Sequence, residues 1–332
     1  MTTQLVILIW LGLAFNFLNG IHDSSNIVAT MISSRALNPR VALGLTAVAE
    51  FIAPFLFGVA VATTIGSGLV VPAVINETVI ISALLAGIIW SLLTWFLGIP
   101  SSSSHALIGG LVGATVLAAG RGAILVSGFE KVLIALLISP VVGLLGGFLF
   151  TKLVLFLAQW TTPRVNWFFK RSQIVTAVAL AFSHGTNDAQ KTMGIITLGL
   201  LTSGYLSSFS VPLWVIAASA GAIALGTALG GWRLIRTLGA SLYKIRPVDG
   251  FCAQATSAIV ILGASLAGGP VSTTQVVSSA IMGVGAAHRI GKVRWGVAGD
   301  ILMAWLVTIP ATALLAAGIY WLLAIAAGEL CS

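Results

Sequence analysis

Long apolar stretches alternate with short polar ones along the chain, and this pattern predicts eight membrane-inserted units. About twenty apolar helical residues cross the hydrocarbon layer of a bilayer, which is about 30 Å thick. Two long stretches, 78–119 and 251–287, are each interrupted by serine- and threonine-rich residues beside a proline. We interpret both as helical hairpins that enter the membrane, break near its middle and return to the same side. The remaining six stretches are interpreted as single crossings: 4–33, 41–65, 131–158, 173–203, 210–231 and 296–325.

Composition supports a membrane location. The 332 residues are 58% hydrophobic and 7% charged, whereas about a quarter of the residues of a soluble domain are charged. The net charge of +8 does not indicate a nucleic-acid partner, because basic residues of membrane proteins collect in cytoplasmic loops. The chain is therefore predicted to be an all-α polytopic membrane protein of about ten apolar helical segments, surrounded by lipid.

The positions of the basic residues predict the orientation. If the N-terminus is outside, thirteen of the sixteen lysines and arginines lie in or beside loops that face the cytoplasm, as the positive-inside rule requires. Both termini are then outside the cell membrane, and spans 4–33 and 173–203 run in opposite directions. Residues 1–160 and 161–332 are therefore predicted to be two inverted repeats within one transmembrane domain, as in many secondary transporters.

The two predicted repeats also match residue by residue. A motif in the first span of each half and a polar break in each hairpin align, and such paired breaks point to a transport site. The first span of each half is expected to be broken at its motif. The aligned pairs are Gly20 with Gly185, His22 with Asn187, Asp23 with Asp188, Pro100 with Pro270, Ser102 with Ser272, Ser103 with Thr273, Ser104 with Thr274, and Gly113 with Gly283.

Two carboxylates lie within apolar spans, Asp23 and Asp188. A carboxylate at the bilayer centre costs about 2.5–3.5 kcal/mol on insertion scales, so it persists where it meets a cation, a proton or a hydrogen-bonding substrate. The alternative is a structural ion pair, for which Lys191 is a candidate partner of Asp188, while Asp23 has no such neighbour. The duplication of the motif favours a functional role for both.

The hairpin breaks offer donors for an anion. A helix that restarts after a proline leaves unpaired N–H groups and the positive end of its dipole within the membrane, and hydroxyl groups add further donors. The alternative is that the hydroxyls only cap their own helices. The predicted anion-binding hydroxyls are those of Ser101, Ser102, Ser103, Ser104, Ser272, Thr273 and Thr274.

Carboxylates beside an anion site favour phosphate over sulfate. Phosphate near neutral pH keeps a proton that an ionised aspartate can accept as a hydrogen bond, and a buried acceptor discriminates against an analogue that lacks the donor. Oxygen ligands at the same motifs suit Na⁺, and unwound carbonyls near Gly20 and Gly185 are expected to complete its shell. The predicted substrate and cation ligands in the spans are Asp23, Asn26, Asn187 and Asp188.

These motifs resemble those of the PiT-type inorganic phosphate transporters, which are ion-coupled phosphate symporters, over nearly the whole chain. The resemblance rests on the duplicated Gly-x-x-Asp motif, the Pro-x-Ser hairpin breaks at 100–104 and 270–274, and the GFCAQ stretch at 250–254. It implies a homodimer. The chain departs from the family pattern at His22, where asparagine is usual, and at Gln254, where many members have glutamate.

The coupling ion is predicted to be Na⁺, with H⁺ as the alternative. Glu50, which resembles a family position linked to transport, and Gln254 join the candidate cation ligands. Glu50 has the alternative of a helix-interface carboxylate held neutral by burial. His22, His105 and His184 are candidates for a proton relay, and the alternative for each is a satisfied buried histidine.

The predicted function is a symporter that carries phosphate by alternating access around a site at the membrane midplane. The alternatives are a transporter for sulfate or another oxyanion on the same scaffold, and an anion channel with a serine-lined pore. No nucleophile with a matching base and no metal-ligand spacing emerges, so the chain is not predicted to be an enzyme. No organic cofactor is expected.

Overall fold

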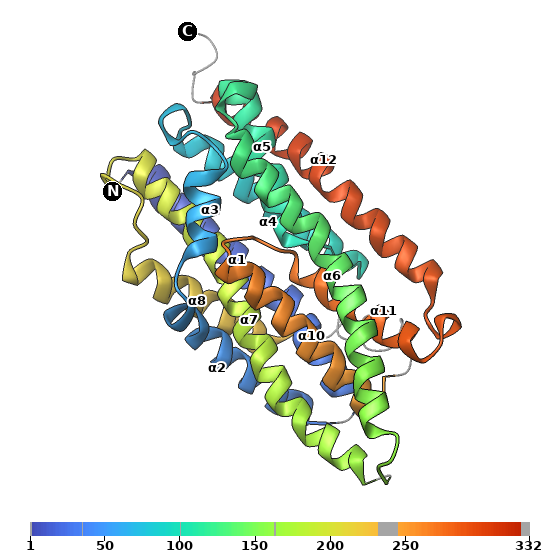
Figure 1. The fold of residues 1–332 in the computed structure, drawn as a ribbon. Coiled ribbons are helices and arrows are strands. Elements are labelled where there is room, and N and C mark those ends of the chain that lie inside the picture. The colour runs from blue at the N-terminus through green and yellow to red at the C-terminus, as the bar shows by residue number, and fades with distance from the viewer. Residues whose placement is uncertain (1, 35, 100, 163, 232–244, 327–332) are drawn as a thin grey trace.

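A computed structural model describes residues 2–34, 36–99, 101–162, 164–231 and 245–326, and helices dominate these ranges (Figure 1). Three short 3-10 helices lie between the longer ones: η1 (Pro72–Val74), η2 (Arg121–Ala123) and η3 (Ile290–Lys292). The α-helices are α1 (Thr3–Ser33), α2 (Pro39–Phe57), α3 (Ala60–Gly68), α4 (Glu77–Leu97), α5 (Ser103–Ala119), α6 (Val126–Ala158), α7 (Val165–Thr202), α8 (Leu213–Leu229), α10 (Pro247–Leu266), α11 (Thr273–His288) and α12 (Trp295–Ala326).

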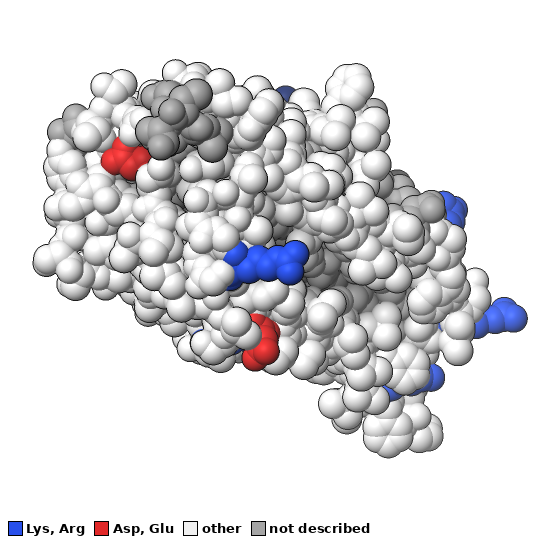
Figure 2. All heavy atoms as spheres, turned by 90° about the horizontal axis from the view of Figure 1, so that it is seen from above, with Lys and Arg blue, Asp and Glu red and all other residues white. Residues whose placement is uncertain are grey.

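Six of the described helices are long and apolar enough to cross a membrane, namely α1, α2, α4, α6, α10 and α12. Large apolar side chains cover the outside of the molecule. Leu137 of α6 is 62% exposed and Leu314 of α12 is 76% exposed. Charged side chains are sparse on the face shown in Figure 2. Such a surface suits hydrocarbon rather than water, which confirms the predicted multi-pass membrane protein.

Polar linkers interrupt both predicted hairpins. Helix α4 ends at Leu97, and the following Gly98 has a φ of +71°, in the left-handed region that glycine adopts at helix ends. Helix α5 begins after Ser102 and α11 after Ser272, and each serine hydroxyl accepts a backbone N–H from its own first turn. Each predicted hairpin is thus a helix, a linker and a second helix. Pro100 lies outside the described residues.

The predicted span at 41–65 is not one continuous helix, because the structure has two helices there. Helix α2 ends at Phe57 and α3 begins at Ala60. Gly58 between them has a φ of +76°, a conformation that does not continue a right-handed helix and that glycine adopts at little cost.

The predicted breaks in the first span of each half are wrong. Helices α1 and α7 run without interruption through Gly20 and Gly185. A Cβ at Gly20 would collide with the carbonyl oxygen of Ile223, and one at Gly185 would lie 2.7 Å from that of Glu50. The glycines therefore allow close helix contacts. Because carbonyls inside a continuous helix are already hydrogen-bonded, the expected cation ligands near these glycines are not available.

The second helix of each hairpin packs against a long helix from the other part of the chain. A Cβ at Gly109 of α5 would lie 2.6 Å from the Ile309 carbonyl oxygen of α12. A Cβ at Gly147 of α6 would lie 2.5 Å from the Ala280 carbonyl oxygen of α11. Small residues allow this close approach of helix backbones in membranes. The packing brings the interrupted ends of the hairpins into the interior.

Candidate functional site

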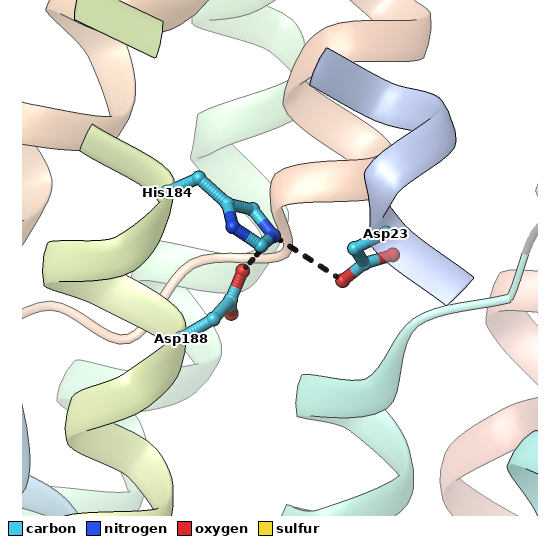
Figure 3. Close-up of side chains that lie close together, drawn as sticks. All are labelled: Asp23, His184 and Asp188. Atoms are coloured by element: carbon cyan, nitrogen blue, oxygen red, sulfur yellow. Dashed lines mark ion pairs between the residues drawn. The ribbon is translucent and has the colours of Figure 1, made fainter. Parts of the chain in front are cut away.

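Two carboxylates from distant parts of the chain meet around one histidine (Figure 3). His184 Nε2 lies 2.8 Å from Asp188 Oδ2 and 3.7 Å from Asp23 Oδ2. His184 and Asp188 share one face of α7 because they are four residues apart, and Asp23 comes from α1. All three side chains are buried, and each offers a ligand atom within 4.8 Å of the others. The cluster therefore has the donor set of a small cation site.

Two threonines at the start of α11 link these carboxylates to the second hairpin. The Thr273 hydroxyl lies 2.8 Å from Asp188 Oδ2 and 3.4 Å from Asp23 Oδ2. The Thr274 hydroxyl donates to Asp23 Oδ1 at 2.9 Å. Hydrogen bonds to ionised groups are stronger than neutral ones, so the start of α11 holds both carboxylates in place.

Asn26 completes the Asp23 side of the cluster. Its Nδ2 donates to Asp23 Oδ1 at 2.8 Å and to the Thr274 hydroxyl at 2.9 Å. Its Oδ1 is buried without a hydrogen-bond partner among the described residues. A buried acceptor without a partner is costly, so this oxygen is a candidate ligand atom.

Lys191 lies in the cluster, although sequence reasoning named it only as a counter-charge for Asp188. Its Nζ contacts Asp188 Oδ1, the Ser104 hydroxyl at 2.5 Å and the Val271 carbonyl oxygen at 2.8 Å. The ion pair considered as an alternative is therefore present, but it forms part of the site. The sequence did contain a signal for this role, namely a lysine within an apolar span. Ionisable residues inside the membrane usually mark functional sites.

Glu50 reaches the cluster through His184. Its Oε1 lies 2.6 Å from His184 Nδ1, and both side chains are buried. The imidazole thus stands between a carboxylate on α2 and the carboxylates on α1 and α7.

The remaining predicted hydroxyls contact other groups. Ser101 shares a hydrogen bond of 2.7 Å with Thr94 of α4. Ser102 and Ser272 cap α5 and α11, so the capping alternative describes these two residues. Ser103 is buried in the first turn of α5.

Two of the predicted cation ligands support neighbouring segments. Asn187 Nδ2 donates to the Ser265 hydroxyl at 2.8 Å, near the end of α10. Gln254 joins α7 to α1, since its Oε1 accepts from Thr176 at 2.7 Å and its Nε2 donates to Thr30 at 2.8 Å.

The other two candidate histidines contact different parts of the site. His22 Nδ1 is 3.3 Å from Asp23 Oδ1. His105 Nδ1 shares a hydrogen bond of 2.7 Å with Ser102, and its Nε2 lies 3.4 Å from Gln275 Nε2. His105 therefore lies between the two hairpin breaks.

The fold is all-helical and multi-pass, and its buried ionisable groups lie where interrupted helices meet. This combination is typical of a membrane transporter. The model of the phosphate transporter family matches residues 19–167 and 157–316. The chain belongs to this family. Its members are transporters and not enzymes, which confirms the family resemblance and the prediction of no enzymatic activity.

Related proteins match this chain in sequence over nearly its whole length. The chain is 46% identical to a protein of Rhizobium meliloti and 45% identical to one of Bacillus subtilis, each named "Probable low-affinity inorganic phosphate transporter", and covers 96% of both chains in each case. A solved structure, titled "The sodium-dependent phosphate transporter", has a TM-score of 0.88 and 26% identity, and the match covers 98% of this chain and 100% of that one.

Proposed function

We propose that the chain is a cation-coupled phosphate symporter of the cell membrane. The observation that carries the proposal is the convergence of Asp23 and Asp188 on the hydroxyls of Thr273 and Thr274. A carboxylate accepts a hydrogen bond from a phosphate P–OH group, while hydroxyls and helix N-termini donate to the other phosphate oxygens. Sulfate has no such proton near neutral pH, so its charge faces the carboxylates without compensation.

The proposed mechanism is alternating access between two inverted halves, 1–160 and 161–332. Its support is the order of elements: α1 is followed by the hairpin α4–α5 and the long helix α6, and α7 is followed by α10–α11 and α12. The contact of α5 with α12 matches that of α11 with α6. The hairpins are re-entrant, both termini lie outside, and the halves rock around the carboxylates. The homodimer implied by the family resemblance stays a prediction.

Na⁺ is proposed as the coupling ion. The Thr274 hydroxyl lies 2.9 Å from Asp23 Oδ1, and Asn26, which contacts both through its Nδ2, adds a buried amide oxygen without a hydrogen-bond partner among the described residues. Carboxylate, hydroxyl and amide oxygens are the ligands of hard cations. The structurally similar transporter is sodium-dependent by title. Glu50 acts on this site through His184, and Gln254 holds α1 against α7.

Proton coupling is the second candidate. It is favoured by the buried chain from Glu50 through His184 to Asp188, with distances of 2.6 Å and 2.8 Å. An imidazole between two carboxylates can pass a proton from one to the other. Phosphate uptake that follows a pH gradient in the absence of Na⁺ would select this candidate over Na⁺ coupling.

The test is uptake of labelled phosphate into proteoliposomes under separate Na⁺ and H⁺ gradients, with sulfate as competitor. We expect saturable uptake driven by an inward cation gradient and little inhibition by sulfate. The double variant Asp23→Asn, Asp188→Asn should lose this uptake, because it lacks both carboxylate acceptors. Glu130→Gln removes an exposed carboxylate of α6 and should retain it. Wild-type rate and ion dependence in the double variant would refute the proposal.

A further inference from the structure

The two sides of the site share three matching positions, and the nitrogen donor is charged at only one of them. Each side consists of an aspartate, a nitrogen donor three residues after it, and a hydroxyl from the hairpin of the other half. The alignment that pairs Asp23 with Asp188 also pairs the two nitrogen donors. The sets are Asp23, Asn26 and Thr274 on one side, and Asp188, Lys191 and Ser104 on the other.

Lys191 is held as a bound cation would be held. Its ammonium group contacts a carboxylate oxygen of Asp188, the Ser104 hydroxyl at 2.5 Å and the Val271 carbonyl oxygen at 2.8 Å. Carboxylate, hydroxyl and carbonyl oxygens are also the ligands of hard metal cations. An ammonium has three donors, so these three oxygens satisfy it. The side chain is only 2% exposed, and its charge offsets that of Asp188.

The Asp23 side has the corresponding carboxylate and hydroxyl oxygens, with Asn26 in place of the lysine. Asn26 supplies a neutral amide, and its Oδ1 is buried with no hydrogen-bond partner in the described part of the chain. Rotation of the amide by a half turn brings this oxygen to face Asp23 and Thr274, since oxygen and nitrogen exchange places in an amide flip. A carboxylate, a hydroxyl and an amide oxygen then lie together on the Asp23 side, where the Lys191 ammonium contacts a carboxylate, a hydroxyl and a backbone carbonyl oxygen.

We propose that Lys191 is a tethered cation that permanently fills one of two equivalent cation positions, so that the coupling ion exchanges only on the Asp23 side. This inference rests on the proposed symport function. A tethered charge is not released on either side of the membrane, so each cycle carries one cation fewer than a site with asparagine at both positions.

The test is the variant Lys191→Asn, which copies Asn26 into the second position. Fluxes of labelled Na⁺ and labelled phosphate are measured together in proteoliposomes. We expect the variant to carry about one additional Na⁺ per phosphate and its dependence on Na⁺ to become steeper, because a second exchangeable site now has to be filled. If the wild type is driven by protons, the variant should gain a dependence on Na⁺ that the wild type lacks.

Two further variants separate charge from structure. Lys191→Met removes the ammonium without supplying an oxygen, and should lose uptake at every Na⁺ concentration. Lys170→Asn makes the same substitution as the test variant at an exposed position of the same helix, and should keep the wild-type ratio of Na⁺ to phosphate.

Thermal unfolding in detergent gives a readout that does not need transport. A ligand that binds the folded state raises the melting temperature. Lys191→Asn should therefore gain more stability from NaCl, relative to choline chloride, than the wild type does. The inference is overturned if Lys191→Asn is active with the wild-type ratio of Na⁺ to phosphate and the wild-type steepness of its dependence on Na⁺. It is also overturned if this variant is inactive and Na⁺ stabilises it no more than the wild type. A wild type without any cation-driven phosphate uptake would refute the proposed function instead.

Discussion

The polar side chains of the site form hydrogen bonds and ion pairs mainly with one another. The Asp23 carboxylate receives hydrogen bonds from Asn26 and Thr274, and Asp188 contacts Lys191 and Thr273. Most of these side chains come from segments far apart in the sequence. Because hydrogen bonds to charged groups contribute more than neutral ones, losing one shared donor should affect both carboxylates together.

Thr273 is the shared donor, so replacing it tests the site at the scale of one hydroxyl group. Thr273→Val keeps the shape and removes the donor that reaches Asp188 at 2.8 Å and Asp23 at 3.4 Å. We expect phosphate uptake to fall by about ten- to a hundredfold, since a hydrogen bond to a charged group contributes about 1.5–3 kcal/mol. Thr273→Ser retains the hydroxyl and should keep most of the activity. Equal uptake by the two variants would contradict this role.

At the scale of the elements, glycine determines which helices approach closely. Gly20 and Gly185 lie in continuous helices and contact α8 and α2, although the sequence suggested breaks there. The breaks lie instead in the linkers before α5 and α11, where serine caps restart the helix. The site therefore combines two rigid helices, α1 and α7, with two helix starts.

The contact of α11 with α6 gives a stability prediction. A Cβ at Gly283 would collide with the Leu144 carbonyl oxygen and lie 3.0 Å from the Phe148 nitrogen. We expect Gly283→Ala to destabilise the protein by about 1–3 kcal/mol, as overpacking does, which thermal unfolding in detergent measures. Gly263→Ala is the control, because a Cβ at this helical glycine meets no atom within 4 Å. A melting temperature of Gly283→Ala at or above that of the control would be the contrary result.

At the scale of the whole molecule, the two halves are interlocked. Helix α5 packs on α12 and α11 packs on α6, so each hairpin is held by the long final helix of the other half. The loops that follow α5 and α11 lie toward opposite ends of the molecule (Figure 1). This arrangement leads to a prediction about which side of the membrane each loop faces.

Single cysteines in these loops test the proposed inverted topology. In a background with Cys252 and Cys331 replaced, Arg121→Cys follows α5 and Arg289→Cys follows α11, and both positions are exposed. A membrane-impermeant maleimide added to intact cells should label the cysteine at 121 and leave the one at 289 unlabelled until the membrane is opened. The reverse pattern would place the termini inside, and labelling of both would rule out hairpins that open to opposite sides.

Sequence alone was enough for the class of protein, the approximate spans and the two motifs, because apolar length and composition are local properties of a chain. It also located Asp23, Asp188 and the hydroxyl-rich breaks, because placing a polar residue in an apolar span costs free energy and such residues are therefore rare.

Only the tertiary structure decided how these residues combine. Thr273 and Thr274 contact the carboxylates, while Ser101 and Ser102 contact Thr94 and His105. Lys191 contacts both Asp188 and Ser104. Thr274 and Asp23 are 251 positions apart in the chain. The partner of a buried polar group is set by how helices pack, and this packing depends on contacts that no local pattern contains.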